Sequence, residues 1–290
     1  MEGRAVAPGA GTVLNALATG RGAAFAIDLE TTASVELTDD GAVVGEIADA
    51  PEADTTLIER CAELTIEHYA ETAGFDAAST GSIVRTESDV PMAAGLKSSS
   101  AAANATVLAT LDALGVAESV DALAACRLGV AAARDAGVTV TGAFDDASAS
   151  MLGGVTITDN ATDELLAHDT VNWDVLVYTP PTQSFSATAD TEACERVAPI
   201  ADLVVELALD GRYGEAMTVN GFAFCGALEY STAPMLDALP DVRGVSLSGT
   251  GPSYVAVGSG ASLDPVEVAW RERPGTIRRS TTRTEGATIR

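Results

Sequence analysis

Between a predicted strand and a predicted helix, the chain carries the segment Pro91-Met92-Ala93-Ala94-Gly95-Leu96-Lys97-Ser98-Ser99-Ser100-Ala101. Gly95 permits a tight bend of the backbone, and the serines fall where the helix begins. The first turn of a helix presents unpaired N–H groups at the positive end of its dipole, and serine hydroxyls add further donors. Lys97 is the only lysine of the chain, beside fifteen arginines, which indicates that a compact point charge is wanted here. The whole segment is therefore predicted to bind phosphate groups.

An ordinary serine-capped helix is the alternative interpretation, because serine is common at helix starts. One glycine, one lysine and three serines together favour the binding loop. The segment is no Walker A loop, since its glycine and lysine are not adjacent. A dinucleotide fingerprint is also missing, because Tyr254 stands where a third glycine would follow Gly249 and Gly251.

The charge balance of the chain is extreme, with 42 acidic against 16 basic residues and a net charge of −26. Such a charge makes the compact state repel itself, and salt screens that repulsion. The composition therefore predicts adaptation to concentrated salt and excludes nucleic acid and anionic membranes as partners. Aromatic residues make up only 4% of the chain, so we expect a core of small side chains.

Cysteine and histidine usage argues against a structural zinc site, because no CxxC pair exists and only two histidines are present. We expect the four cysteines to be small buried side chains. No secretory signal and no apolar run of about 18 residues is found, so a cytoplasmic location is expected. The sequence leaves open whether the chain forms a homodimer. The cysteines are Cys61, Cys126, Cys194 and Cys225.

The elements upstream of the loop are read from hydrophobic periodicity and turn residues. Asp39-Asp40-Gly41 predicts a hairpin turn, and Gly74 predicts the end of a helix. The predicted elements are strands within residues 4–47, including one at 42–47 after the turn, a helix over 53–73, a strand over 81–88 and a helix over 98–114.

Downstream, Ser119 is expected to cap a helix that runs to about Asp135. Residues 160–170 are polar and mark a predicted boundary between domains 1–160 and 161–290. Helices and strands mix throughout, which predicts an α+β class. The remaining predicted elements are short ones over 136–160, a strand over 171–178, helices over 189–209 and 212–229, two strands around 249–251 and basic strands within 264–290.

The loop resembles the PxxxGLxSSAA phosphate loop of the GHMP kinases, a family that includes galactokinase, homoserine kinase, mevalonate kinase and phosphomevalonate kinase. Two further segments resemble the other motifs of that family in the same order: Ala7–Gly11 resembles the first motif and Ser246–Ser253 the third, with the phosphate loop as the second. The resemblance implies a two-domain α+β GHMP kinase fold. Its N-terminal domain would be a mixed β/α domain that holds the phosphate loop, and its C-terminal domain a ferredoxin-like α/β domain. It also implies an ATP-dependent small-molecule kinase that uses Mg²⁺.

The same resemblance assigns a catalytic base. Family members such as mevalonate kinase carry an aspartate followed by serine and glycine at a spacing that Asp146, Ser150 and Gly153 match. Asp146 is therefore expected to accept or orient the proton of the attacking hydroxyl, with Asp145 as second choice and Lys97 beside them. Taken alone, the two aspartates are explained equally well as caps of a short helix.

Ser99 and Asp135 match the positions of Mg²⁺ ligands in the family, although Asp135 could equally be a solvated charge at a helix end. Two departures separate the chain from mevalonate kinase. Ala10 stands where that enzyme has a lysine, and its Gly-Glu-His sequence is missing.

Within the family, three stretches resemble the archaeal type of shikimate kinase: Ala7–Gly22, Thr141–Ser150 and Ser248–Ser253. This resemblance implies transfer of the γ-phosphoryl group of ATP to shikimate, giving 3-phosphoshikimate in chorismate biosynthesis. Arg21 lies in the substrate-side motif and is expected to bind the substrate carboxylate, although a surface or structural arginine explains it equally well. Homoserine kinase and a non-catalytic GHMP-like binding protein are the alternatives. The residues expected to bind substrate are Asn15, Arg21, Ser248, Gly249, Thr250 and Gly251.

Overall fold

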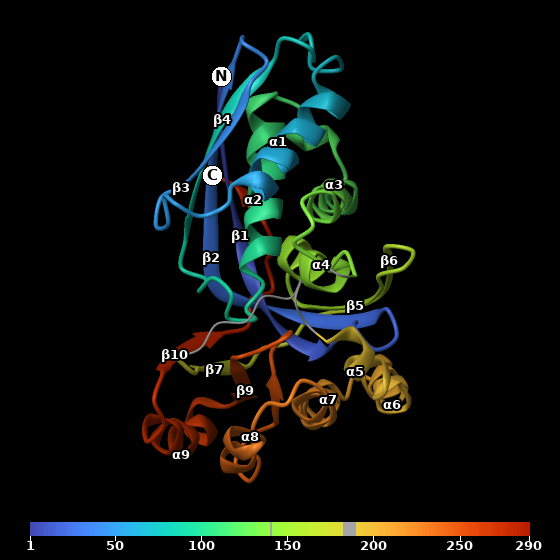
Figure 1. Cartoon of the computed structure of the whole chain (residues 1–290), viewed down its shortest axis with the longest axis vertical. Coiled ribbons are helices and arrows are strands. Elements are labelled where there is room, and N and C mark those ends of the chain that lie inside the picture. The colour runs from blue at the N-terminus through green and yellow to red at the C-terminus, as the bar shows by residue number, and fades with distance from the viewer. Residues whose placement is uncertain (140, 182–189) are drawn as a thin grey trace.

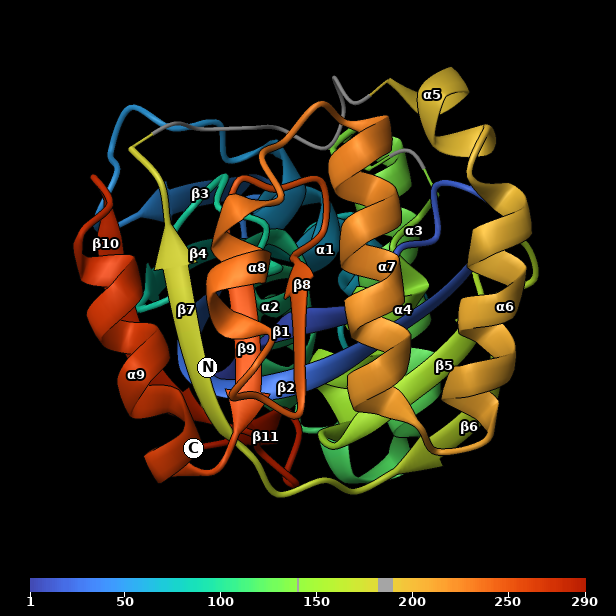
Figure 2. The ribbon, with the colours of Figure 1, turned by 90° about the horizontal axis from the view of Figure 1, so that it is seen from below.

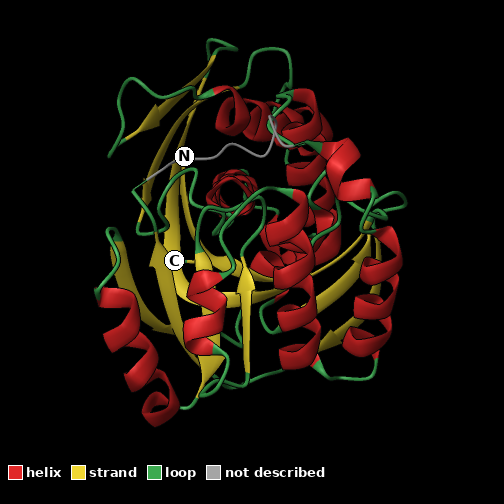
Figure 3. Cartoon of the chain, turned by 60° about the horizontal axis from the view of Figure 1, so that its bottom comes forward, coloured by secondary structure: helices red, strands yellow, loops and turns green. Residues whose placement is uncertain are grey.

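Two β-sheets organise the chain, and helices lie on each of them in layers (Figure 1). The computed structural model describes residues 1–139, 141–181 and 190–290. The larger sheet and the first four helices form the upper unit in Figure 1, and the smaller sheet with the remaining helices forms the lower unit. Helices and strands occupy separate layers in both units (Figure 3).

The larger sheet has the strand order β11-β1-β2-β4-β3, and β2 also pairs with β5, which continues to β6. Its pairs are antiparallel except for β3 with β4. The long strands β1 and β2 belong to this sheet, and their lower ends reach the lower unit, where β1 contacts α6 and α7. The strands are β1 (Glu2–Leu14), β2 (Arg21–Thr38), β3 (Val43–Ile47), β4 (Gly81–Ser88), β5 (Val155–Asp159), β6 (Glu164–Asp169) and β11 (Thr288–Ile289).

The helix that follows the phosphate loop lies at the centre of this unit. Alanines on one side of it face the sheet, and Ala103, Val107 and Leu111 on the other side face the neighbouring helices. The small side chains allow close approach, since a Cβ on Gly3 would lie 2.1 Å from the carbonyl oxygen of Ala109. The helices are α1 (Thr56–Tyr69), α2 (Ser98–Ala113), the short 3₁₀ helix η1 (Ala117–Ser119), α3 (Ala122–Asp135) and α4 (Phe144–Leu152).

The smaller sheet is antiparallel and has the order β10-β7-β9-β8. In chain order its elements run strand, helices, strand, strand, helix, strand, which is the ferredoxin-like arrangement that was predicted. Its strands are β7 (Asp174–Thr179), β8 (Gly244–Leu247), β9 (Tyr254–Gly258) and β10 (Thr276–Thr281).

Alternate residues of β7 face two different apolar cores. Val175 and Val177 pack with Phe25 between the two sheets, whereas Leu176 and Tyr178 pack beneath the helices. Seen from below, α7, α8 and α9 lie over the outer face of the small sheet, with α6 beside α7 (Figure 2). The helices are α5 (Thr191–Glu195), α6 (Ala198–Leu209), α7 (Tyr213–Ala227), α8 (Ala233–Ala238) and α9 (Gly260–Arg271).

The last residues of the chain return to the upper unit. The N–H of Gly154 donates to the carbonyl oxygen of Arg283, and the N–H of Ala287 donates to that of Met151, so this tail holds the C-terminal end of α4. β11 then pairs with β1. The domain boundary predicted after residue 160 stays a prediction; β6, which follows it, pairs with β5.

Three sequence-based expectations are wrong. Asp39-Asp40-Gly41 forms a turn, but no hairpin, because β4 inserts between β2 and β3 and pairs with β3 in parallel. Asp121 rather than Ser119 caps α3, accepting hydrogen bonds from two backbone N–H groups. Residues 264–271 are helical, since the capping box of Ser259 starts α9 upstream of them.

All four cysteines are free and buried, as expected. Burial raises the pKa of the Cys61 and Cys126 thiols far above the usual range, so both stay uncharged. No helix in the described ranges is long and apolar enough to cross a membrane.

Candidate active site

The phosphate loop bends sharply between β4 and α2. Ala93, Gly95 and Lys97 have positive φ angles of 53°, 78° and 65°, which only glycine adopts without strain. A Cβ on residue 95 would lie 2.2 Å from the carbonyl oxygen of Ser248, so no larger residue fits there. The loop is thus pressed against the third motif, and its shape depends on that contact.

The first turn of α2 is open for an anion. Lys97 is its N-cap residue and gives no side-chain cap, and no acidic residue lies in the first turn. Within the described ranges, the hydroxyls of Ser98, Ser99 and Ser100 make no hydrogen bond to the protein. These donors, together with the free N–H groups of the turn, suit the oxygens of a phosphate chain. Ser99 is exposed, as a ligand to a phosphate-bound cation would be.

Lys97 and Asp146 form an ion pair at this helix end. The Nζ of Lys97 lies 2.9 Å from Oδ1 of Asp146, and the two side chains are only 7% and 16% exposed. The geometry of this contact does not meet the angles of a hydrogen bond. Among the described residues, the buried Oδ1 of Asp146 accepts no hydrogen bond, so the contact is an ion pair only. The same Nζ would lie 2.9 Å from a Cβ on Gly249, so that glycine makes room for the lysine. An ammonium, a carboxylate and an uncapped helix start therefore meet at one place.

Asp145, the neighbouring carboxylate, faces the protein instead. It is 4% exposed, and Nδ2 of Asn160 donates to its Oδ1 over 2.7 Å. A Cβ on Gly22 would lie 2.3 Å from its Oδ2. Burial and the charge of Asp146 raise the pKa of Asp145, so its carboxyl group resists ionisation. The geometry favours Asp146 over Asp145 as the group that meets a substrate.

The first and third motifs lie directly against the loop. The N–H of Ala10 donates to the carbonyl oxygen of Leu96 over 3.1 Å. The Ser248 hydroxyl donates to the carbonyl oxygen of Gly95 over 2.8 Å, and the N–H of Gly249 donates to Thr12 Oγ1 over 2.8 Å. The three segments, distant in sequence, thus build one site.

Asn15 is committed to the protein scaffold of this site. Its Nδ2 donates to the carbonyl oxygen of Gly249 over 2.9 Å, and its Oδ1 accepts from the N–H of Leu17. Thr250 is buried in the same loop, and Gly251 lies against the ring of Tyr230. Substrate contacts by these residues stay predictions.

Arg21 begins β2 and is exposed. Its neighbour Gly22 faces Asp145, and because side chains alternate along a strand, Arg21 leaves on the opposite face. No contact in the described ranges brings its guanidinium to Lys97 or Asp146. Its role in carboxylate binding stays a prediction that this orientation does not favour.

The structure places Asp135 in an ion pair with Arg60 of α1, with 2.8 Å between Nε and Oδ2. No contact among the described residues connects it to Lys97 or Asp146. These residues also contain no group of three or more histidine, cysteine, aspartate or glutamate side chains that could hold a metal.

Sequence reasoning missed three residues that support the site: Thr12, Asn160 and Asn220. Asn220 Oδ1 accepts from the N–H of Asn15 over 2.9 Å, and its Nδ2 donates to the Ser246 hydroxyl. A lone buried amide in the apolar helix α7 is a signal that could have identified Asn220. Asn160 falls in a polar stretch that was interpreted as a boundary, so no local pattern distinguishes it.

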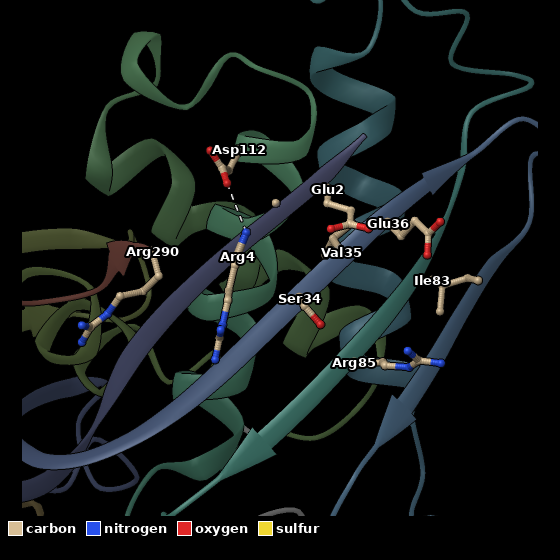
Figure 4. Close-up of a pocket in the computed structure, with 10 residues that line it drawn as sticks. Glu2, Arg4, Ser34, Val35, Glu36, Ile83, Arg85, Asp112 and Arg290 are labelled. Carbon is tan, nitrogen blue, oxygen red and sulfur yellow. Dashed lines mark hydrogen bonds between the residues drawn. The ribbon is translucent and has the colours of Figure 1, made fainter.

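A separate pocket of about 410 Å³ lies on the outer face of the large sheet (Figure 4). Arg4, Arg85 and Arg290 line it together with Glu2, Glu36 and Asp112, so its charges balance. None of its lining residues belongs to the three motifs. The convergence of those motifs, rather than this hollow, identifies the candidate active site.

Comparison with known proteins agrees with this geometry. Residues 56–154 match the model of the GHMP kinases N terminal domain. The chain is similar in fold to the homoserine kinase of Cytophaga hutchinsonii (17% identity, TM-score 0.76, 100% of this chain and 97% of that chain). It is also similar in fold to the mevalonate kinase of Methanococcus jannaschii (14% identity, TM-score 0.76, 96% of this chain and 98% of that chain).

Similarity in sequence is much higher to curated shikimate kinases. The enzyme of Halobacterium salinarum is 62% identical over 99% of this chain and 99% of its own length. The enzyme of Methanococcoides burtonii is 52% identical over 92% of this chain and 91% of its own length. The chain belongs to the GHMP kinase superfamily and, within it, to the family of the archaeal shikimate kinases.

Proposed function

We propose that the chain transfers the γ-phosphoryl group of ATP to the 3-hydroxyl of shikimate, giving ADP and 3-phosphoshikimate. The ion pair between Lys97 and Asp146, beside the open first turn of α2, is the observation that supports this function best. Relatives of 40 to 62% identity that are shikimate kinases support the choice of substrate.

Phosphoryl transfer needs positioning and charge neutralisation more than covalent chemistry. In this proposal the serines and N–H groups of α2 hold the phosphates, and Lys97 neutralises charge on the transferred group. Asp146 accepts the proton of the attacking hydroxyl, and the ion pair with Lys97 holds this carboxylate in place. Both side chains are largely buried, which limits the access of bulk water to the pair.

Mg²⁺ fits as a cofactor that the phosphates of ATP bring with them. Few side chains at the first turn of α2 could complete the coordination of Mg²⁺, and the hydroxyl of Ser99 is the proposed ligand. The cation would supply further neutralisation of phosphate charge. Asp135 is not favoured for this role because it is paired with Arg60.

A panel of three acceptors tests the substrate. The chain is incubated with ATP and Mg²⁺ and with shikimate, homoserine or mevalonate, and ADP release is measured. We expect release with shikimate and little with the other two, since unpaired buried polar groups make a site reject analogues that lack hydroxyls. Turnover of homoserine with none of shikimate would overturn the proposal and leave the superfamily alone.

We also propose that the chain works in concentrated salt, because its net charge of −26 opposes both compaction and the approach of ATP. The midpoint of thermal unfolding should rise with KCl, and the KM for ATP should fall. Equal stability in dilute buffer and in molar KCl would contradict this proposal. A cytoplasmic location stays a prediction.

A further inference from the structure

Asn160 lies directly after β5, and both the nitrogen and the oxygen of its side-chain amide form hydrogen bonds with Asp145. Its Nδ2 donates to Asp145 Oδ1 over 2.7 Å, and its Oδ1 accepts from the backbone N–H of Asp145 over 3.1 Å. The side-chain oxygen also accepts from the Thr158 hydroxyl over 2.8 Å. The residue is 2% exposed, so these bonds do not compete with bulk water.

The backbone of Asn160 is fixed as firmly as its side chain. Its N–H donates to the carbonyl oxygen of Gly20 over 2.8 Å, and its carbonyl oxygen accepts from Arg134 Nη2 over 3.1 Å. Arg134 is in turn held by two hydrogen bonds of 2.7 Å to Asp163. Asn160 thus connects the turn before β2, helix α3 and the start of α4.

The start of α4 depends on such support. Its N-cap residue, Ala143, has a positive φ of 51° and gives no side-chain cap. A first turn without a cap frays more readily than a capped one. Asp146 lies in this turn, next to Asp145, so any displacement of the turn moves the carboxylate relative to Lys97.

We propose that Asn160 is a positioning residue for phosphoryl transfer: by holding Asp145 it fixes the first turn of α4 and keeps Asp146 in contact with Lys97. The inference rests on the proposed function, because it concerns the same carboxylate. Asn160 acts through Asp145 and does not itself touch the reacting atoms.

The test is a reciprocal exchange of the two side chains. Asn160→Asp keeps the size of the side chain but opposes two carboxylates, so we expect kcat to fall about 10–100-fold, the scale of a misplacement near 1 Å. The KM values for ATP and shikimate should change less than about threefold. Adding Asp145→Asn restores one donor and one acceptor, now with the amide on residue 145 and the carboxylate on residue 160, and kcat should return to within about threefold of wild type.

A second set of variants separates positioning from general stability. Asn160→Ala should repeat the loss of kcat, whereas Ile66→Ala, in a cluster of α1 that contacts no residue of α4, should lower thermal stability and leave kcat intact below its unfolding transition. Normal kcat in both Asn160 variants, or a folded exchange variant as slow as Asn160→Asp alone, would overturn the role of Asn160. A wild-type chain inactive on shikimate would overturn the proposed function instead.

Discussion

Helices α2 and α4 begin in the same unusual way and carry opposite chemistry. Each follows a non-glycine residue with positive φ, Lys97 at 65° and Ala143 at 51°, and neither has a side-chain cap. By contrast, α3 begins with an ordinary aspartate cap, Asp121. The first turn of α2 has no acid and three hydroxyls, whereas that of α4 has Asp145 and Asp146.

The difference shows how one kind of helix end can serve two tasks. An uncapped first turn attracts negative charge. In α4 the protein supplies that charge itself, as Asp145 and Asp146, and in the proposed function Asp146 meets the substrate hydroxyl. In α2 the first turn has no acid, and the proposed source of its negative charge is the phosphate chain of ATP. Lys97 is the N-cap residue of α2 and forms an ion pair with Asp146 of α4, so it lies between the two helix ends.

Removing the charge from α4 should have the largest effect. Asp146→Asn keeps the shape of the side chain, and loss of a general base costs about 10²–10⁴ in rate. The kcat for shikimate should fall by that factor while ATP binding survives. Asp145→Asn is the matched control, and it should retain much more activity; the reverse ranking would move the base by one residue.

Removing the shared cation should have a smaller effect on rate. Lys97→Met deletes one charge-assisted contact, so kcat/KM for ATP should fall about tenfold or more. Lys97→Arg tests whether the point charge matters, because a planar guanidinium cannot replace an ammonium beside Gly249 without crowding. Unchanged steady-state kinetics with ATP in Lys97→Met would remove the lysine from the site.

Making the first turn of α2 resemble that of α4 should also weaken ATP binding, with a smaller effect than the loss of Lys97. Ser100→Asp places a carboxylate in the first turn, and we expect the KM for ATP to rise about tenfold or less, the scale of one displaced charge contact. Thermal stability should not fall, since an acid in a first turn stabilises a helix by about 0.3–1 kcal/mol. Ser100→Asn is the uncharged control; an equal rise in KM there would mean that bulk, and not charge, is responsible.

The buried acid of α4 should produce the smallest effect, on stability alone. Because the folded state raises the pKa of Asp145 above its usual 3.8, its contribution to stability is full below pH 3.8 and is lost as pH rises through the folded value. Asp145→Asn removes this loss, so the variant should gain stability relative to wild type between pH 5 and 8. Each kcal/mol corresponds to about 2–4 °C in the unfolding midpoint. A difference that does not depend on pH would show that this carboxyl group does not titrate on folding.

Local patterns were enough to predict α2, β4 and the loop between them, since glycine, serines and an alanine-rich stretch act over neighbouring residues. The same kind of evidence predicted the strands on both sides of Gly249-Thr250-Gly251. These are also the segments that build the candidate site, so the sequence was enough to predict which segments come together there.

Non-local pairing could not be predicted in the same way. The turn at Asp40 resembles a hairpin turn, yet β3 does not pair with the preceding strand β2. It pairs with β4, which comes much later in the sequence. Asn160 is similar, because its role depends on the pairing of β2 with β5, which brings Gly22 to Asp145. The choice between Asp145 and Asp146 likewise required knowledge of which carboxylate faces Lys97.

The tail that returns to α4 has a consequence for the order in which the protein folds. Hydrogen bonds from Gly154 to Arg283 and from Ala287 to Met151 fix the end of the helix that carries Asp146, and β11 completes the sheet beside β1. These contacts join residues that lie far apart in sequence, so a long loop must close before they can form. The phosphate loop and α2 depend on nearer neighbours and can assemble earlier. The C-terminal support of α4, and with it the final position of the helix that carries Asp146, is therefore expected to form late in folding.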